Sequence, residues 1–314
     1  MVNKNNGKNG GLTSFIGPAT PAKASGVTYS LAAILSVVVG FLFLLFIAVL
    51  GLAEEGYAER DWYLYCSYLL VPLTFLLVAA FVLRWSGQAL GAEIRAQACP
   101  VRYFVIAILL QIGLLCLSQL NDEFLKWLGR FGYEDTPITL PSLDGFGFVG
   151  VLITVAVLPA IFEEVIFRGL LLKGMKCFGM VGAVLLNGAL FALYHQNPAQ
   201  TMYQFCCGCA FAFVALRAGS ILPTVLSHFI NNALIITLMK FGVTDMQGTT
   251  FIVVLIVSIL CLIASLVWLF FFDKGKNPPQ CKGNKTEKKH FFLFASVGIA
   301  MYALTWISVL LTGL

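Results

Sequence analysis

Long runs of apolar residues, separated by short polar segments, follow one another along almost the whole chain. Runs of roughly 20 residues can be placed at 30–53, 62–84, 102–120, 148–172, 179–197, 202–217, 220–240, 250–272 and 291–313. A helix of about 20 apolar residues crosses the hydrocarbon core of a bilayer, whereas membrane β-barrels show alternating segments of about 10 residues. The pattern therefore predicts an all-α, polytopic transmembrane helix bundle with about eight or nine spans.

Composition supports a membrane protein. Hydrophobic residues make up 59% of the 314-residue chain and charged residues 11%, whereas about 25% of the residues in a soluble domain are charged. The formal net charge is +5, but the basic residues gather between the apolar runs, where they set topology. We therefore expect the lipid bilayer as a partner and no nucleic acid.

The distribution of Lys and Arg predicts the orientation of the chain. With the N-terminus in the cytoplasm and the spans alternating, every basic residue except Arg60, Lys126, Arg130 and Lys240 falls on the side assigned to the cytoplasm. An excess of basic residues marks the cytoplasmic loops of membrane proteins. We therefore expect a cytoplasmic N-terminus and an integral protein of the cell (plasma) membrane.

Four segments are expected from the pattern and the position of the polar residues. These are a flexible polar tail at 1–26, N-terminal transmembrane helices at 27–147, an intramembrane core at 148–240 and C-terminal transmembrane helices at 241–314. The Lys-rich loop at 273–290 would connect the last two spans and contact anionic lipid.

One group of charged residues lies inside an apolar run. Glu163, Glu164 and Arg168 occur in the sequence Phe-Glu-Glu-Val-Ile-Phe-Arg-Gly. A charged side chain at this depth costs roughly 2.5–3.5 kcal/mol on insertion scales, so an intramembrane acid indicates function. Glu164 and Arg168 share a helix face and can form an ion pair, which supports the structure. Glu163 is rotated by about 100° and stays free to exchange protons.

Further polar side chains lie in two later apolar runs of the core, at 179–197 and 220–240. His195 comes four residues after Phe191, and His228 comes four residues before Asn232, so each pair shares a helix face. Glu163, His195 and the pair His228 with Asn232 would otherwise face lipid unpaired, so we expect them to converge in one polar cavity.

This set of side chains suits hydrolysis. A buried Glu can take a proton from water, a nearby His can orient that water, and a second His with an Asn amide can bind an oxyanion. Alternatively, Glu163, His195 and His228 could bind zinc or another divalent metal. The compact His-Glu-x-x-His motif is absent, and Glu164 is better placed for Arg168 than for catalysis. We therefore expect no cofactor.

The motifs resemble those of a known family. Glu-Glu-x-x-x-Arg at 163–168, Phe-x-x-x-His at 191–195 and His-x-x-x-Asn at 228–232 are similar in order and placement to those of the CPBP (Abi) intramembrane proteases, which include the type II CAAX prenyl endopeptidases. The resemblance implies an endopeptidase acting on a membrane-associated peptide or protein. It implies Glu163 as general base, His195 as its partner on the water, and His228 with Asn232 as the oxyanion site.

Two other classes of function fit a buried Glu and His. A proton-coupled transporter also places such groups in mid-membrane, but the chain shows no duplicated half and no pair of broken spans. A non-catalytic scaffold or immunity factor could bind a membrane peptide without cutting it. The complete set of motifs favours the enzyme, although it does not fix the substrate or show whether the substrate is prenylated.

Overall fold

The computed structural model describes residues 18–87, 95–135, 138–243, 246–273 and 284–314. Helices and short turns make up these ranges, and no strand occurs in them. The polar tail expected at the N-terminus falls largely on residues 1–17, and most of the Lys-rich loop falls on 274–283. Both stretches lie outside the described residues.

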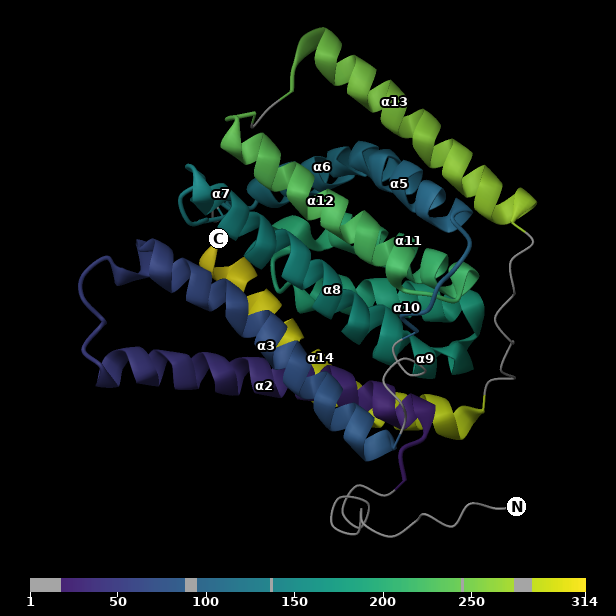
Figure 1. Cartoon of the computed structure of the whole chain (residues 1–314), viewed down its shortest axis with the longest axis horizontal. Helices are drawn as coiled ribbons and strands as arrows, with labels where there is room; N and C mark the ends of the chain where they lie inside the picture. The colour runs from purple at the N-terminus through teal and green to yellow at the C-terminus, as the bar shows by residue number, and fades with distance from the viewer. Residues whose placement is uncertain (1–17, 88–94, 136–137, 244–245, 274–283) are drawn as a thin grey trace.

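Figure 1 shows the helices packed into one bundle. The longer helices are α2 (Pro21–Val49), α3 (Asp61–Ser86), α5 (Arg102–Leu114), α6 (Ser118–Gly129), α10 (Gly179–Tyr194), α11 (Thr201–Ala218), α12 (Leu222–Lys240), α13 (Gly248–Val267) and α14 (Lys285–Thr312). Shorter pieces are α7 (Phe146–Val151), α8 (Leu158–Glu164), α9 (Leu172–Met175), the π-helical segments η3 (Leu152–Val157), η4 (Val165–Leu171) and η7 (Trp268–Phe272), and the 3₁₀ turns η1 (Tyr57–Glu59), η2 (Leu115–Leu117), η5 (Lys176–Phe178) and η6 (Pro198–Gln200).

The predicted fold class is confirmed. Within the described residues, 8 helical stretches are long and apolar enough to cross a membrane. The longest, Phe146–Tyr194, has 49 residues and would measure about 74 Å if straight, more than twice the thickness of a bilayer core.

That stretch is a hairpin. It turns at Gly179, whose φ of +77° is open to glycine. The rings of Phe167 and Phe191, on its two arms, have centroids only 5.0 Å apart. The two arms correspond to the spans expected at 148–172 and 179–197.

The first helix begins earlier than the sequence pattern indicates. Thr20 caps α2 by accepting a hydrogen bond from the backbone N–H of Lys23, and Pro21 occupies the first turn, where its missing N–H costs nothing. The helix therefore begins inside the segment that we expected to be a flexible tail. In the next turn, Ser25 is buried and donates a hydrogen bond to the Leu170 carbonyl of η4.

Glycine allows two pairs of helices to approach closely. A Cβ added at Gly298 of α14 would lie 2.8 Å from Ser30 Cα of α2, and one at Gly208 of α11 would lie 2.7 Å from Gly188 Cα of α10. Small residues at such crossings are typical of membrane helices, where close packing replaces the hydrophobic effect. The second crossing matters for the site, because α10 and α11 enclose Arg168.

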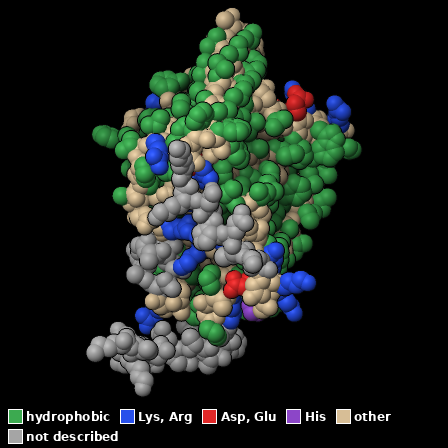
Figure 2. All heavy atoms as spheres, turned by 90° about the vertical axis from the view of Figure 1, so that its right-hand side faces the viewer, with side chains coloured by type: hydrophobic (Ala, Val, Ile, Leu, Met, Phe, Trp, Pro, Cys, Tyr) green, Lys and Arg blue, Asp and Glu red, His purple; other side chains and the backbone are tan. Residues whose placement is uncertain are grey.

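The outer surface is apolar. Large hydrophobic side chains are exposed along α2 and α13, among them Phe41, Phe46, Ile256, Leu260 and Ile263. Figure 2 shows hydrophobic side chains over much of one face. A soluble monomer rarely exposes a contiguous patch of this kind, whereas lipid covers it without cost. The chain is an integral membrane protein.

The orientation of the chain remains a prediction. We expect a reporter fused after residue 314 to be extracellular and one inserted in the 273–290 loop to be cytoplasmic, because the excess of basic residues belongs on the cytoplasmic side. The side of each site would be checked in intact cells by placing a single cysteine there and measuring its reaction with a membrane-impermeant thiol reagent. If both sites lie on the same side, the span count is wrong.

Candidate active site

The two acids lie at the end of a short helix between two π-helical segments. Glu163 and Glu164 are the last residues of α8, with η3 before it and η4 after it. A π-helical turn is wider than an α-helical turn and is often found at functional sites. Both side chains are buried, at 6% and 0% exposure.

Glu164 forms the predicted ion pair with Arg168. The guanidinium Nη1 lies 2.6 Å from Glu164 Oε1, and both side chains are fully buried. Arg168 Nη2 also donates to the Gly208 carbonyl at 3.2 Å, and the guanidinium stacks 4.3 Å from the centre of the Phe191 ring. The charge of Glu164 is therefore compensated by the fold.

Glu163 has weaker compensation. Tyr194 donates a hydrogen bond to its Oε1 at 3.3 Å. Its Oε2 is buried, and no donor among the described residues forms a hydrogen bond to it. His228 Nε2 lies 3.8 Å from Oε2, a distance that one water oxygen in contact with both atoms can bridge. Glu163 is thus the acid that remains open to a reacting water.

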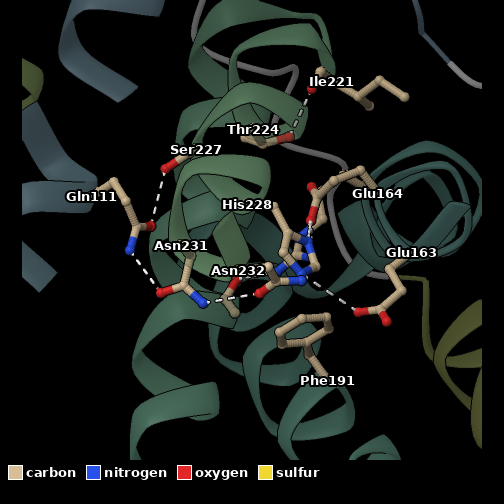
Figure 3. A network of polar contacts seen from close by, with 12 residues as sticks. Gln111, Glu163, Glu164, Phe191, Ile221, Thr224, Ser227, His228, Asn231 and Asn232 are labelled. Atoms are coloured by element: carbon tan, nitrogen blue, oxygen red, sulfur yellow. Dashed lines mark hydrogen bonds and ion pairs between the residues drawn. The ribbon is translucent and has the colours of Figure 1, made fainter. Parts of the chain in front are cut away.

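His228 lies between the two acids. Its Nδ1 is 3.1 Å from Glu164 Oε1, while its Nε2 faces Glu163 (Figure 3). An ionised carboxylate can only accept a hydrogen bond, so Nδ1 carries a proton. Nε2 then has a lone pair in the neutral ring and donates a hydrogen bond only when the ring is an imidazolium. Sequence reasoning paired His228 with Asn232 and did not anticipate this contact with Glu164.

His195 follows the last residue of α10, and its Nδ1 lies 2.8 Å from the carbonyl oxygen of Phe191. Because a carbonyl can only accept, this Nδ1 is protonated, and the neutral ring presents the lone pair of Nε2. The ring also packs edge-on against Phe191, with centroids 4.7 Å apart. The Phe-x-x-x-His spacing thus fixes the position and the tautomer of His195.

Asn232 projects from α12 one turn after His228. Its Nδ2 donates to the Val155 carbonyl at 3.2 Å, and its Oδ1 accepts from Asn231 Nδ2 at 3.1 Å. Asn231 in turn accepts hydrogen bonds from Gln111 and Tyr203. Figure 3 shows this row of amides beside the two acids.

The four predicted site residues line one cavity of about 1120 Å³. Glu163, His195, His228 and Asn232 all contribute to its wall, together with Tyr194 and Asn231. All four therefore border the same cavity. Apolar side chains from α12 and α13 line another part of the wall: Ile235, Leu238, Met239, Phe251, Val254 and Leu255.

Sequence reasoning missed several polar residues of the site. Tyr194 directly precedes a predicted site residue but reads as one more aromatic in an apolar span. Asn231 and Gln111 could have been identified from the sequence, because an amide in mid-membrane must have a hydrogen-bond partner inside the bundle. Gln111 stands alone in the apolar stretch Ala-Ile-Leu-Leu-Gln-Ile-Gly-Leu-Leu.

The geometry also bears on the alternative metal site formed by Glu163, His195 and His228. Among the residues that the structure describes, no three His, Cys, Asp or Glu side chains are arranged to hold a metal ion. The set Glu163, His195 and His228 therefore does not fit a zinc site in this arrangement. That catalysis needs no metal remains a prediction.

The fold and site define a class: a polytopic helical membrane protein with two buried acids, and with two imidazoles and an amide that line the same cavity as one of them. Residues 145–234 match the model of the Rce1-like family, described as Type II CAAX prenyl endopeptidase Rce1-like. The match spans all three motifs and confirms the resemblance to the CAAX-type membrane proteases. No curated protein and no solved structure matches the chain.

Proposed function

We propose that this protein is an intramembrane endopeptidase that hydrolyses a peptide bond of a membrane-associated substrate. One observation carries the proposal: Glu163 lines the cavity, its buried Oε2 has no hydrogen-bond donor among the described residues and lies 3.8 Å from His228 Nε2, while the adjacent Glu164 forms an ion pair with Arg168. An acid without full compensation in a cavity is suited to accept a proton from water.

The proposed reaction assigns one role to each group. Glu163 removes a proton from water as its oxygen attacks the carbonyl carbon of the scissile peptide bond. The lone pair of His195 Nε2 accepts a hydrogen bond from the same water and orients it. The carbonyl oxygen becomes an oxyanion, which accepts hydrogen bonds from Asn232 Nδ2 and from His228 as imidazolium. The C–N bond then breaks, and Glu163 returns its proton to the amine leaving group.

The substrate class is also a proposal. The family match names prenyl endopeptidases of CAAX tails, and an apolar wall on α12 and α13 runs beside the polar site. A peptide with a prenylated Cys-aliphatic-aliphatic-X end is therefore the first probe to test. We further propose a cell-membrane location with the N-terminus in the cytoplasm.

The test compares wild-type protein with Glu163→Ala. Purified protein in lipid nanodiscs is incubated with the prenylated peptide, and the products are identified by mass spectrometry. In parallel, membrane proteomes of cells that express either form are compared for proteins of changed length. Cleavage by the wild type alone supports the endopeptidase. Binding without cleavage would instead indicate a scaffold, and proton-coupled uptake into liposomes would indicate a transporter.

We expect activity to survive removal of metal. The site residues account for proton transfer and oxyanion binding without one, and they do not assemble a ligand set. Exhaustive chelation, with the metal content assayed in parallel, should leave kcat within about twofold of the value for the untreated enzyme. The loss of one oxyanion donor, by comparison, typically lowers kcat by about 10²–10³. Loss on chelation that stoichiometric zinc restores would make Glu163, His195 and His228 ligands.

A further inference from the structure

A row of three amides connects α5 with the cavity. Gln111 Nε2 donates to Asn231 Oδ1 at 2.8 Å, and Asn231 Nδ2 donates to Asn232 Oδ1 at 3.1 Å. Gln111 and Asn231 are buried, at 1% and 5% exposure. Figure 3 shows the row ending beside the imidazole of His228. Each amide can be turned by 180° about its last bond, which would exchange its donor and its acceptor.

One backbone carbonyl sets the direction of the whole row. Asn232 lies 3.2 Å from the oxygen of Val155, which can only accept, so the atom facing it must be Nδ2. Asn232 Oδ1 then faces Asn231, which must present Nδ2. Asn231 Oδ1 in turn faces Gln111, which must present Nε2. Reversing any single amide would place two acceptors or two donors face to face.

The hydroxyl groups near the far end of the row are compatible with this direction, because a hydroxyl can donate or accept. Ser227 Oγ lies 3.2 Å from Gln111 Oε1 and 3.2 Å from the Ala107 carbonyl oxygen, and the Tyr203 hydroxyl donates to Asn231 Oδ1 at 2.8 Å. Asn231 Oδ1 therefore accepts two hydrogen bonds, and the Val155 carbonyl is the group that sets the direction of the row.

The sequence explains why the Val155 carbonyl can take part. In an α-helix, this carbonyl would accept a hydrogen bond from the N–H of the residue four positions later, which is Pro159. Proline has no N–H. Val155 lies in the π-helical segment η3, and Pro159 is the second residue of α8. Pro159 thus removes the α-helical partner, and a π-helical bond from the N–H of Ala160 would occupy only one of the two lone pairs, so the carbonyl oxygen can accept the hydrogen bond from Asn232.

We propose that Gln111 is a positioning residue for catalysis: through Asn231 it holds the Asn232 side chain in the orientation that the Val155 carbonyl sets, with Nδ2 as the donor. One Nδ2 hydrogen is used by Val155, and the second is available to an oxyanion. Gln111 lies outside residues 145–234, so the part of the chain that matches the family model does not include it. This inference rests on the proposed oxyanion role of Asn232.

The test is a double-mutant cycle with Gln111→Glu and Asn232→Ala. The introduced side chain has the shape of Gln, and when ionised it places an acceptor against Asn231 Oδ1, which forces the row to turn, so kcat is measured at a pH where the carboxyl is ionised. With the prenylated peptide, Gln111→Glu should lower kcat by about 10–100-fold, as small displacements of catalytic groups do, with KM within about threefold. In the Asn232→Ala background the same change should lower kcat by less than about threefold.

A matched control uses the same substitution elsewhere. Gln97 donates to the Gly219 carbonyl at an exposed position, and Gln97→Glu should leave kcat unchanged. An equal loss of kcat from Gln111→Glu in both backgrounds would overturn the inference, because Gln111 would then act independently of Asn232.

A structure of the variant tests the inference without activity. In Gln111→Glu, or in Gln111→Met if the first variant does not fold, the Asn232 side chain should leave hydrogen-bond distance of the Val155 oxygen. An unchanged Asn232 would overturn the positioning role even if the enzyme is active. If the wild type cuts no probe but the variant structure shows the displacement, the proposed function fails and the positioning of Asn232 stands.

Discussion

Glu163→Gln should reduce kcat by about 10²–10⁴, the contribution typical of a positioned general base. The amide cannot accept a proton from water, yet it has the same shape, and its oxygen can still accept the hydrogen bond from Tyr194. The variant should therefore fold and bind substrate normally. Measurements of kcat and KM with the prenylated peptide, together with thermal unfolding in detergent, would check both parts.

Glu164→Gln provides the comparison for Glu163→Gln. The Glu164 carboxylate accepts hydrogen bonds from Arg168 and from His228 Nδ1. Its replacement by an amide should therefore lower the stability of the fold and also disturb the position of His228. The assignment of the base to Glu163 fails if Glu163→Gln keeps more than about a tenth of the wild-type kcat, since a base contributes at least about 10².

Arg168→Met should lower the free energy of unfolding by about 3–5 kcal/mol, because it leaves a buried carboxylate without its partner. Arg168 is among the largest fully buried side chains in the described part of the chain, and it bonds both Glu164 and the Gly208 carbonyl. Reversible unfolding in mixed micelles would measure the loss.

Two controls separate charge from packing in that experiment. The double variant Glu164→Gln, Arg168→Met removes both charges and should recover most of the loss, since replacing a buried pair costs far less than breaking it. Arg60→Met breaks an exposed pair with Glu54, whose side chains are 52% and 64% exposed, and should cost at most about 1 kcal/mol. If the double variant is as unstable as Arg168→Met, the role of Arg168 is packing rather than charge compensation.

Much of the architecture follows from local rules that the sequence obeys. Apolar runs of membrane length predict the spans, including the two arms of Phe146–Tyr194, which is one long apolar stretch that turns at Gly179. The pairing of Glu164 with Arg168 follows from a spacing of four residues. The separate orientation of Glu163 follows from the rotation of about 100° per residue.

The convergence of His195, His228 and Asn232 on Glu163 was also predictable, because polar groups in a membrane must find partners inside the bundle. Which atom meets which was not predictable. Sequence reasoning paired His228 with Asn232 on the same helix, but in the structure His228 lies between the two acids of α8. Contacts between helices depend on crossing angles and rotations, which the periodicity of a single helix does not specify.

The sequence by itself therefore determined the class of protein, the positions of most spans and the set of reactive side chains, since these depend on composition and on spacing within one helix. The tertiary structure alone decided that Tyr194 bonds Glu163, that Arg168 is enclosed by α10 and α11, and that the Val155 carbonyl directs the Asn232 amide. The physical reason is that each of these contacts joins residues on different helical segments. Their geometry is fixed only when the whole bundle packs.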